Sequence, residues 1–305
     1  MQELIMRRSI LTATALAASL ATPAFAHDGD KPRIDDHAPI GVMADHYHKK
    51  GEWMASARYM TMGMGDPANT MMGPQDMDGT MIMVGGMYAV SDKLTLAAGL
   101  KYTGRSMEMV MMGNEMEREA DGVGDLKLMA ITPLFDNGSS RLLFSFGGTV
   151  PTGKTSETDH MGNLLPLKMQ PGNDSWSLTP GLTYTRFGNG WSFGLQAKAA
   201  FWLDDASTAE KPGDSWQVTS WGSLTVTDNF SVSARLAYED ESAWRGVSPL
   251  SAGARERLRG FVGTNLYATG THRIGVEFGF PIAESRGTNN MGTGTSLMVG
   301  WQKAF

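Results

Sequence analysis

Twelve stretches of about ten residues, in which apolar side chains alternate with polar or small ones, succeed one another from residue 52 to the C-terminus. Between residues 191 and 201, Trp191, Phe193 and Leu195 share one face, opposite Ser192 and Gly194. This alternation is typical of a β-strand with one apolar face, and about ten residues is the length that a tilted strand needs to cross a bilayer. The expected strands cover residues 52–61, 80–90, 94–105, 122–134, 141–150, 176–185, 191–201, 214–226, 230–239, 258–267, 272–281 and 294–305. The sequence therefore predicts an all-β fold, a transmembrane antiparallel β-barrel of about 12 strands over residues 52–305.

The connections between these stretches alternate in length. The short ones are rich in Gly, Asn and Asp and cover residues 91–93, 135–140, 186–190, 227–229 and 268–271. The long ones cover residues 62–79, 106–121, 151–175, 202–213, 240–257 and 282–293. Short periplasmic turns and long outer loops are typical of outer-membrane barrels, and an even strand number leaves both termini in the periplasm. A soluble β-sandwich also alternates, but the aromatic residues at strand ends favour a girdle in contact with outer-membrane lipid: Trp191, Phe201, Phe230 and Tyr238.

The N-terminus has the features of an export signal. Arg7 and Arg8 precede an apolar run over residues 10–21, and Ala24-Phe25-Ala26 supplies the small residues of a cleavage site. The run has 12 residues, whereas a spanning helix needs ~20. We therefore expect residues 1–26 to be a signal peptide. Residues 27–51 are polar without periodicity, and we expect a periplasmic N-terminal segment that enters or caps the lumen, because a polar segment has no place in lipid.

Composition and the C-terminus limit the partners. The formal net charge of −6 leaves no basic field for nucleic acid, so we expect no nucleic-acid partner. The chain has no cysteine, so no disulfide can form. Trp301 and Phe305 in the last alternating stretch favour recognition by the barrel-assembly machinery, although Lys303 departs from the usual apolar pattern. We expect no enzyme and assign no catalytic residue, because His160 lacks the nucleophile and acidic partners that a barrel hydrolase needs.

Several motifs resemble one known family. Residues 122–128 read Gly-Val-Gly-Asp-Leu-Lys-Leu, residues 150–153 Val-Pro-Thr-Gly, residues 170–176 Gln-Pro-Gly-Asn-Asp-Ser-Trp, residues 180–184 Pro-Gly-Leu-Thr-Tyr and residues 299–305 Val-Gly-Trp-Gln-Lys-Ala-Phe. In order and spacing they resemble the outer-membrane family named for the meta-pathway of phenol degradation. Residues 37–54 look like a Met-rich branch of that family associated with copper. The resemblance implies a passive outer-membrane transporter, with small aromatic or hydrophobic compounds as the suggested cargo.

Methionine is concentrated in one region. Of 23 methionines, 14 lie between Met60 and Met116. Parity places nine of them on the inward, polar face of three successive strands or their extensions, near the outer mouth: Met60, Met62, Met64, Met81, Met83, Met87, Met107, Met109 and Met111. Thioether sulfur is a soft ligand that selects Cu(I) over hard cations, so the spacing favours a site for transient Cu(I). Two other interpretations stay open, a flexible packing surface or apolar ligand path and an oxidant-absorbing surface.

Histidines and lumen charges add two further expectations. His46 and His48, two residues apart near His37 and Met43, have metal-ligand spacing, and solvated side chains are the alternative. His27, at the expected mature N-terminus, could chelate Cu(II). The expected lumen charges are Arg58, Lys101, Arg105, Lys127, Arg141, Lys198, Arg235 and Arg273 against Asp125, Glu239 and Glu277. They would favour anions or neutral solutes in a wide pore, and would pair and block a narrow one.

These features predict a function. We expect a passive transporter or channel of the cell outer membrane, without a resident cofactor, whose Met-rich mouth handles copper. The first alternative is a channel for small aromatic or hydrophobic compounds. The second is a structural barrel without transport.

Overall fold

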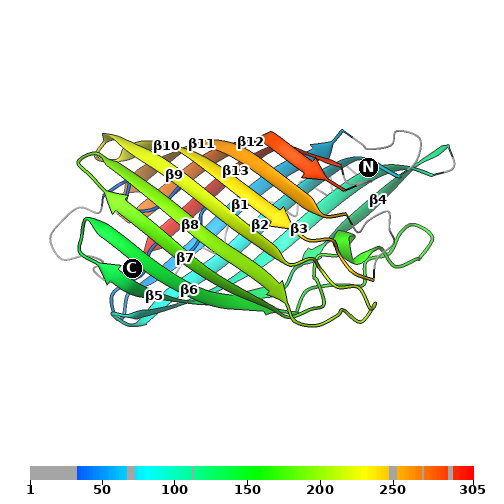
Figure 1. Cartoon of the computed structure of the whole chain (residues 1–305), viewed down its shortest axis with the longest axis horizontal. Coiled ribbons are helices and arrows are strands. Elements are labelled where there is room, and N and C mark those ends of the chain that lie inside the picture. Colours follow the sequence, from blue (N-terminus) through cyan, green and yellow to red (C-terminus); the bar gives the residue numbers. More distant parts are fainter. Residues whose placement is uncertain (1–32, 67–72, 112, 247–252, 270, 288–290) are drawn as a thin grey trace.

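The computed structural model describes residues 33–66, 73–111, 113–246, 253–269, 271–287 and 291–305. Within these ranges the chain forms thirteen β-strands and one short 3-10 helix (Figure 1). The elements are β1 (Trp53–Gly65), β2 (Gly73–Ser91), β3 (Leu94–Met111), β4 (Asn114–Val123), β5 (Leu126–Asp136), β6 (Ser140–Val150), η1 (Leu167–Met169), β7 (Ser177–Phe187), β8 (Trp191–Trp202), β9 (Ser215–Thr227), β10 (Phe230–Glu241), β11 (Arg255–Thr269), β12 (His272–Arg286) and β13 (Gly292–Ala304). The expected signal peptide lies outside the described residues. No helix among the described residues is long and apolar enough to span a membrane.

The sheet closes on itself. Neighbouring strands pair antiparallel, and β1 pairs with both β2 and β13. β4 and β5 both pair with β3: β5 pairs along residues 95–99 of β3, and β4 pairs along residues 102–111. Together they occupy the position of one interrupted strand in the barrel. The thirteen strands therefore build a closed antiparallel 12-strand barrel, and the predicted fold class is confirmed.

The predicted boundaries were wrong on the long-loop side. The strand expected to start at residue 122 begins with β4 at Asn114, and the connection expected over 106–121 is a β3–β4 hairpin with a turn at Gly113, whose φ is +82°. The connection expected over 62–79 is shortened because β1 reaches Gly65 and β2 starts at Gly73. The extensions were not predicted because they carry polar residues such as Glu108 and Glu117. Strands that continue beyond the bilayer need no apolar outer face.

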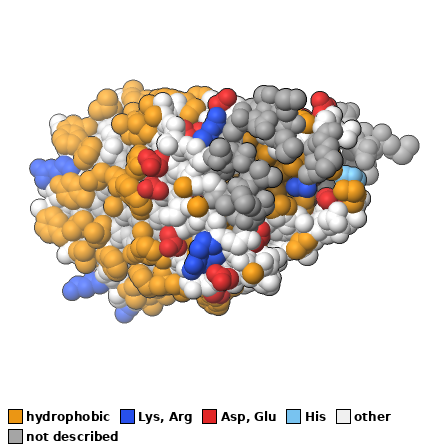
Figure 2. Space-filling model, turned by 45° about the vertical axis from the view of Figure 1, so that its right-hand side comes forward, with side chains coloured by type: hydrophobic (Ala, Val, Ile, Leu, Met, Phe, Trp, Pro, Cys, Tyr) orange, Lys and Arg blue, Asp and Glu red, His pale blue; other side chains and the backbone are white. Residues whose placement is uncertain are grey.

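The outer wall of the barrel is apolar. Leu195, Val232 and Val276 expose 44%, 36% and 38% of their surface, whereas Gln196 and Glu277 on the opposite parity expose 4% and 3%. Figure 2 shows hydrophobic side chains covering much of the left part of the molecule, which carries the short turns and the C-terminus. An apolar outer band with a polar interior is the arrangement of a transmembrane barrel.

The short-turn end of the lumen contains residues 33–52, which we call the lumen segment. Arg58 Nε of β1 donates to the Ile40 carbonyl at 3.1 Å, and Arg273 Nη2 of β12 donates to the Ala38 carbonyl at 2.5 Å. From the other side of the barrel, Gln196 Nε2 of β8 donates to the Met43 carbonyl at 2.7 Å. The segment therefore crosses the bore, in agreement with the expectation that it enters the lumen.

Two glycines make room for the lumen segment. A Cβ on Gly300 would lie 2.6 Å from Cγ1 of Ile40, and one on Gly275 would lie 2.8 Å from its Cβ. Ile40 itself exposes only 2% of its surface. The small inward positions of β12 and β13 therefore form the seat against which the segment packs.

Candidate functional site

A cluster of sulfur-bearing side chains fills the long-loop end of the lumen. Met107, Met109, Met169 and Met291 expose 4–8% of their surface and pack with Ala120 and Leu165. Met64, Met77 and Met116 are partly buried against them. We call these seven methionines the methionine cluster. They come from β1, β2, β3, β4, η1 and the residue before β13, so the cluster bridges several segments of the chain.

Strand register builds the cluster. Met64 pairs with Met77 across β1 and β2, Met77 pairs with Met107 across β2 and β3, and Met109 pairs with Met116 across β3 and β4. Directly opposed residues have Cβ atoms about 4.5–5.5 Å apart. Neighbouring thioethers therefore face one another along the inner wall.

Only part of the predicted methionine set belongs to this cluster. Met64, Met107 and Met109 do. Met60 pairs with Met81 lower in the barrel, and Met87 pairs with Met54 close to the short turns, so these positions do not converge at the outer mouth. Met62 and Met83 are partly buried along the same strands. The side chain of Met111 lies outside the described residues.

Four members of the cluster were missed by sequence reasoning. Met77 lies four residues before Met81, so the alternation of the strand predicts that both side chains point to the same face. Met116 lay in a stretch assigned to a loop. Met169 and Met291 come from η1 and the end of a long connection, and nothing in the local sequence indicates their position.

A polar cavity lies inside the barrel near the long-loop ends of β7, β8 and β9. Its volume is 230 Å³ and Lys101, Lys127 and Lys198 line it together with Asp125 and Glu239. Glu239 is paired with a cation, because it accepts from Arg257 at 2.8 Å. Asp125 accepts from the uncharged Gly153 and Asn173 amides at 2.9 and 2.8 Å and keeps its negative charge, so three lysines face one unpaired carboxylate. Among the ion pairs of the described ranges, none includes these three lysines. The cavity is therefore a cationic chamber.

The other expected lumen charges have structural partners. Arg235 contacts Glu277 at 3.1 and 2.5 Å, with its guanidinium 3.6 Å from the Phe261 ring centroid. Arg105 donates to the carbonyls of Lys168 and Gln170 at 2.6 and 3.1 Å and so holds the connection after β6.

At the short-turn end, Arg141 contacts Asp136 at 2.9 Å and Asp36 of the lumen segment at 3.3 Å. Together with Arg58 and Arg273 it ties the segment to the wall. Sequence reasoning missed the pairs of Arg257 with Glu239 and of Arg255 with Glu284, at 2.8 and 3.3 Å, because residues 255–257 were assigned to a loop.

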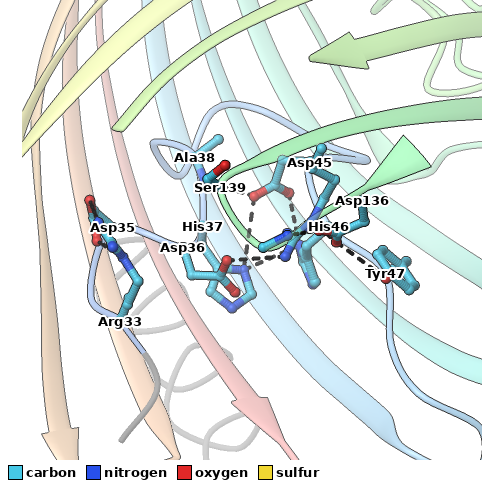
Figure 3. Close-up of polar contacts among 12 residues, drawn as sticks. Arg33, Asp35, Asp36, His37, Ala38, Asp45, His46, Tyr47, Asp136 and Ser139 are labelled. Carbon is cyan, nitrogen blue, oxygen red and sulfur yellow. Dashed lines mark hydrogen bonds and ion pairs between the residues drawn. The ribbon is translucent and has the colours of Figure 1, made fainter. Parts of the chain in front are cut away.

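The short-turn end contains a histidine cluster. His37 Nδ1 lies 3.2 Å from His46 Nδ1, and His46 Nδ1 lies 2.9 Å from Asp45 Oδ1 (Figure 3). A cavity of 290 Å³ adjoins His37, His46 and His48. The sequence expectation paired His46 with His48, but the bend of the lumen segment brings His37 and Asp45 to His46. His48 lies beside the group, its ring centroid 5.1 Å from that of His46 and its Nδ1 3.6 Å from Glu52 Oε2.

Burial and neighbours set the protonation of this cluster. Burial lowers the pKa of His37 well below its ordinary value, and the charges of His46 and Arg273 lower it further. Burial opposes the ionisation of Asp45, but the charge and hydrogen bond of His46 hold its pKa well below the usual range. The group therefore presents a neutral His37 imidazole beside an ionised carboxylate.

Comparisons with known proteins agree with this architecture. Residues 71–248 match the model of a family described as "Putative MetA-pathway of phenol degradation". A solved outer membrane channel from Pseudomonas putida F1 is 16% identical with a TM-score of 0.65, covering 85% of this chain and 97% of that one. The β domain of the Bordetella autotransporter BrkA is 12% identical with a TM-score of 0.53, covering 84% and 100%. A comparison with curated proteins finds no match. The fold and the family place this barrel in the outer membrane.

Proposed function

The chain belongs to the phenol-degradation MetA-pathway family, and from this premise we propose that it is a passive, non-enzymatic outer-membrane channel for small aromatic or hydrophobic compounds. The observation that carries the proposal is the methionine cluster, an apolar lining on the inward face at the long-loop end. Inward positions elsewhere in the barrel are mostly polar or charged. The cluster is packed, and its four most buried methionines expose 4–8% of their surface, so an apolar solute would enter by displacing these flexible side chains.

Methionine suits such a solute. Its unbranched side chain adapts to ligands of different shape, and a sulfur at an aromatic ring edge contributes about 0.3–1.5 kcal/mol. Several weak contacts of this size hold a ring without trapping it. The cluster would thus select rings and apolar groups while allowing release toward the lumen.

The cationic chamber supports the next step of the path. Its volume is 230 Å³, and an apolar cavity of about 150 Å³ accommodates benzene, so one substituted ring fits. Lys101, Lys127 and Lys198 disfavour cations there and favour neutral or anionic solutes. We therefore extend the proposal to aromatic compounds that carry a hydroxyl or a carboxylate.

Copper handling is the second candidate. Seven thioethers from separate segments converge, and soft sulfur ligands favour Cu(I). The bare cation would then meet three lysines below the cluster. For this reason copper is the second candidate after the apolar solute, and we propose only transient binding of Cu(I) at the mouth of the barrel.

The experiment uses the full-length refolded barrel in planar bilayers. Ion current separates a channel from a structural barrel. We expect benzoate to interrupt the current more often than cyclohexanecarboxylate, because only the aromatic ring makes sulfur contacts. Met107→Gln with Met109→Gln should abolish this difference, whereas Met161→Gln in an exposed loop should preserve it. Equal interruption by the two acids in the parent protein would contradict aromatic selectivity.

A second measurement on the same samples separates the two candidates. Replacing Met64, Met107, Met109 and Met169 by Leu keeps volume and apolarity but removes sulfur. Loss of Cu(I) binding with retained transport of the aromatic acid supports the organic solute. If the Leu variant loses both Cu(I) binding and transport of the aromatic acid, the sulfur atoms serve both functions. If the Leu variant still binds Cu(I) tightly, the copper candidate is rejected.

We also propose that the barrel-assembly machinery recognises the protein through its C-terminal strand, β13. In the closed barrel the Phe305 ring stacks on Trp53 at a centroid distance of 3.7 Å, and Phe305 N donates to the Trp53 carbonyl at 2.8 Å. Before closure the same edge is available to a partner strand. Deleting Phe305 should lower the amount of barrel inserted in membranes more than Trp53→Phe, and equal insertion would reject the role.

A further inference from the structure

We propose that the lumen segment carries a binding site for a divalent transition-metal cation, formed by His37, Asp45 and His46. This site is separate from the channel function proposed above, because it lies at the opposite end of the lumen from the methionine cluster. Its ligands belong to one bend of the chain inside the barrel (Figure 3). A cation bound there would join residue 37 to residues 45 and 46.

The distances fit a metal. One nitrogen or oxygen atom from each of the three residues can be chosen so that all lie within 4.8 Å of one another. Tetrahedral ligands about 2.0–2.1 Å from a metal are about 3.3–3.4 Å apart. The separation of His37 Nδ1 from His46 Nδ1 is 3.2 Å, that of His46 Nδ1 from Asp45 Oδ1 is 2.9 Å, and that of His37 Nδ1 from Asp45 Oδ2 is 3.9 Å. Shifts of a few tenths of an ångström would centre an ion among them.

The two imidazoles turn their Nδ1 atoms toward each other at 3.2 Å within a buried group, in which His46 exposes 4% of its surface. At most one of these two atoms can accept when the other carries hydrogen. A shared metal would use both lone pairs at once. The Nε2 atom of His46 has no hydrogen-bond partner among the described residues, but it lies on the other side of the ring and is not a ligand in this arrangement.

The surroundings set the identity and strength of binding. Two imidazoles and one carboxylate suit Zn²⁺ or Cu²⁺ rather than Ca²⁺ or Mg²⁺. Arg273 lies close enough to act on His37 and Asp45 and opposes a cation, which makes the site weaker than three such ligands alone. The adjoining 290 Å³ cavity leaves space for a fourth ligand, which water can provide.

The site would stabilise the segment that crosses the bore. Ala38 N donates to Asp45 Oδ2 at 2.7 Å, so the bend already closes on itself at this carboxylate. A metal would add a second closure through both histidines. The cation would therefore hold the lumen segment in place across the bore.

Titration of untagged, refolded protein that begins at His27, the expected mature N-terminus, tests the site. Isothermal titration with Zn²⁺ should give one equivalent bound by the parent and by His160→Ala, which changes an exposed histidine in a loop. His37→Ala combined with His46→Ala should bind at least a hundredfold more weakly. With Cu²⁺, electron paramagnetic resonance should show coupling to two imidazole nitrogens in the parent. His27→Ala is the control for chelation at the N-terminus and should leave the signal unchanged.

Two outcomes overturn the proposal. One is absence of Zn²⁺ and Cu²⁺ binding by the folded parent, and the other is equal binding by the double variant. If that variant does not fold, Asp45→Asn decides, because it keeps the side-chain shape while removing the ligand charge. It should weaken Zn²⁺ binding at least tenfold, and unchanged affinity rejects the assignment.

Discussion

The short-turn end of the lumen is filled by backbone and the long-loop end by side chains. At the first end, Arg58, Arg273 and Gln196 donate hydrogen bonds to carbonyls of the lumen segment. At the long-loop end, the methionine cluster packs through non-directional van der Waals contacts. Hydrogen bonds fix one geometry, whereas flexible thioethers tolerate many. One barrel thus combines a specific closure at one end with an adaptable mouth at the other.

The two ends of the lumen also differ in how well they tolerate amino-acid substitutions. At the short-turn end a Cβ on Gly41 would lie 2.4 Å from Glu277 Oε1 and 2.7 Å from Arg235 Nη2, so even a methyl group collides with a buried ion pair. At the long-loop end a methionine can be exchanged for leucine with little change of volume. We therefore expect substitutions at the short-turn end to have the larger effects.

The largest expected effect concerns Glu277. Replacing it by Leu leaves the buried Arg235 without its carboxylate, and breaking a buried ion pair costs ~3–5 kcal/mol. Urea unfolding in detergent would measure the loss. The control is Arg235→Met with Glu277→Leu, which removes both charges and should recover most of the stability. A double variant as unstable as the single one would show that packing, rather than charge, holds this end.

The contents of both ends of the lumen depend on which face of each strand is inward. Leu195, near the middle of β8, faces lipid, and Ser233 of β10 faces the lumen. Arg at Leu195 should cost ~2–4 kcal/mol near the bilayer midplane, and Arg at Ser233 much less. Folding into lipid vesicles followed by gel mobility measures both. Equal losses would reverse the assigned faces and, with them, the two ends of the lumen.

A smaller effect is expected at Gln196. Its Nε2 donates to the Met43 carbonyl at 2.7 Å and to Thr183 Oγ1 at 2.8 Å. Gln196→Leu leaves these buried acceptors unpaired and should cost about 1–3 kcal/mol. Ion current should rise at the same time, because the lumen segment loses an anchor. Lower stability with unchanged current would show that the segment does not control the pore.

The smallest effect is expected at the methionine cluster. Met107→Leu conserves volume and should change stability by less than about 1.5 kcal/mol. Thermal unfolding compared with Met161→Leu in an exposed loop provides the matched measurement. A loss as large as that of Glu277→Leu would contradict the view that this end is adaptable.

The barrel, its two faces and its alternating connections could be predicted from the amino-acid sequence. Period-two alternation is a local property of the strand, so Leu195 and Gln196 could be assigned to opposite faces without knowing their neighbours. The inward position of Arg235 and Glu277 followed in the same way. Strand ends beyond the bilayer could not be predicted, because there both faces of β3 and β4 are free to be polar.

The contents of the lumen, in contrast, depend on how the closed barrel brings distant segments together. Met169 and Met291 reach Met107 through long connections, and His37 reaches His46 through a bend, so no residue spacing encodes these contacts. The reason is that the lumen is shared by the whole barrel and is filled by whichever segments closure brings together. Ile40 packs where Gly275 and Gly300 leave space on two different strands. Such a fit is a property of the closed barrel rather than of any one strand.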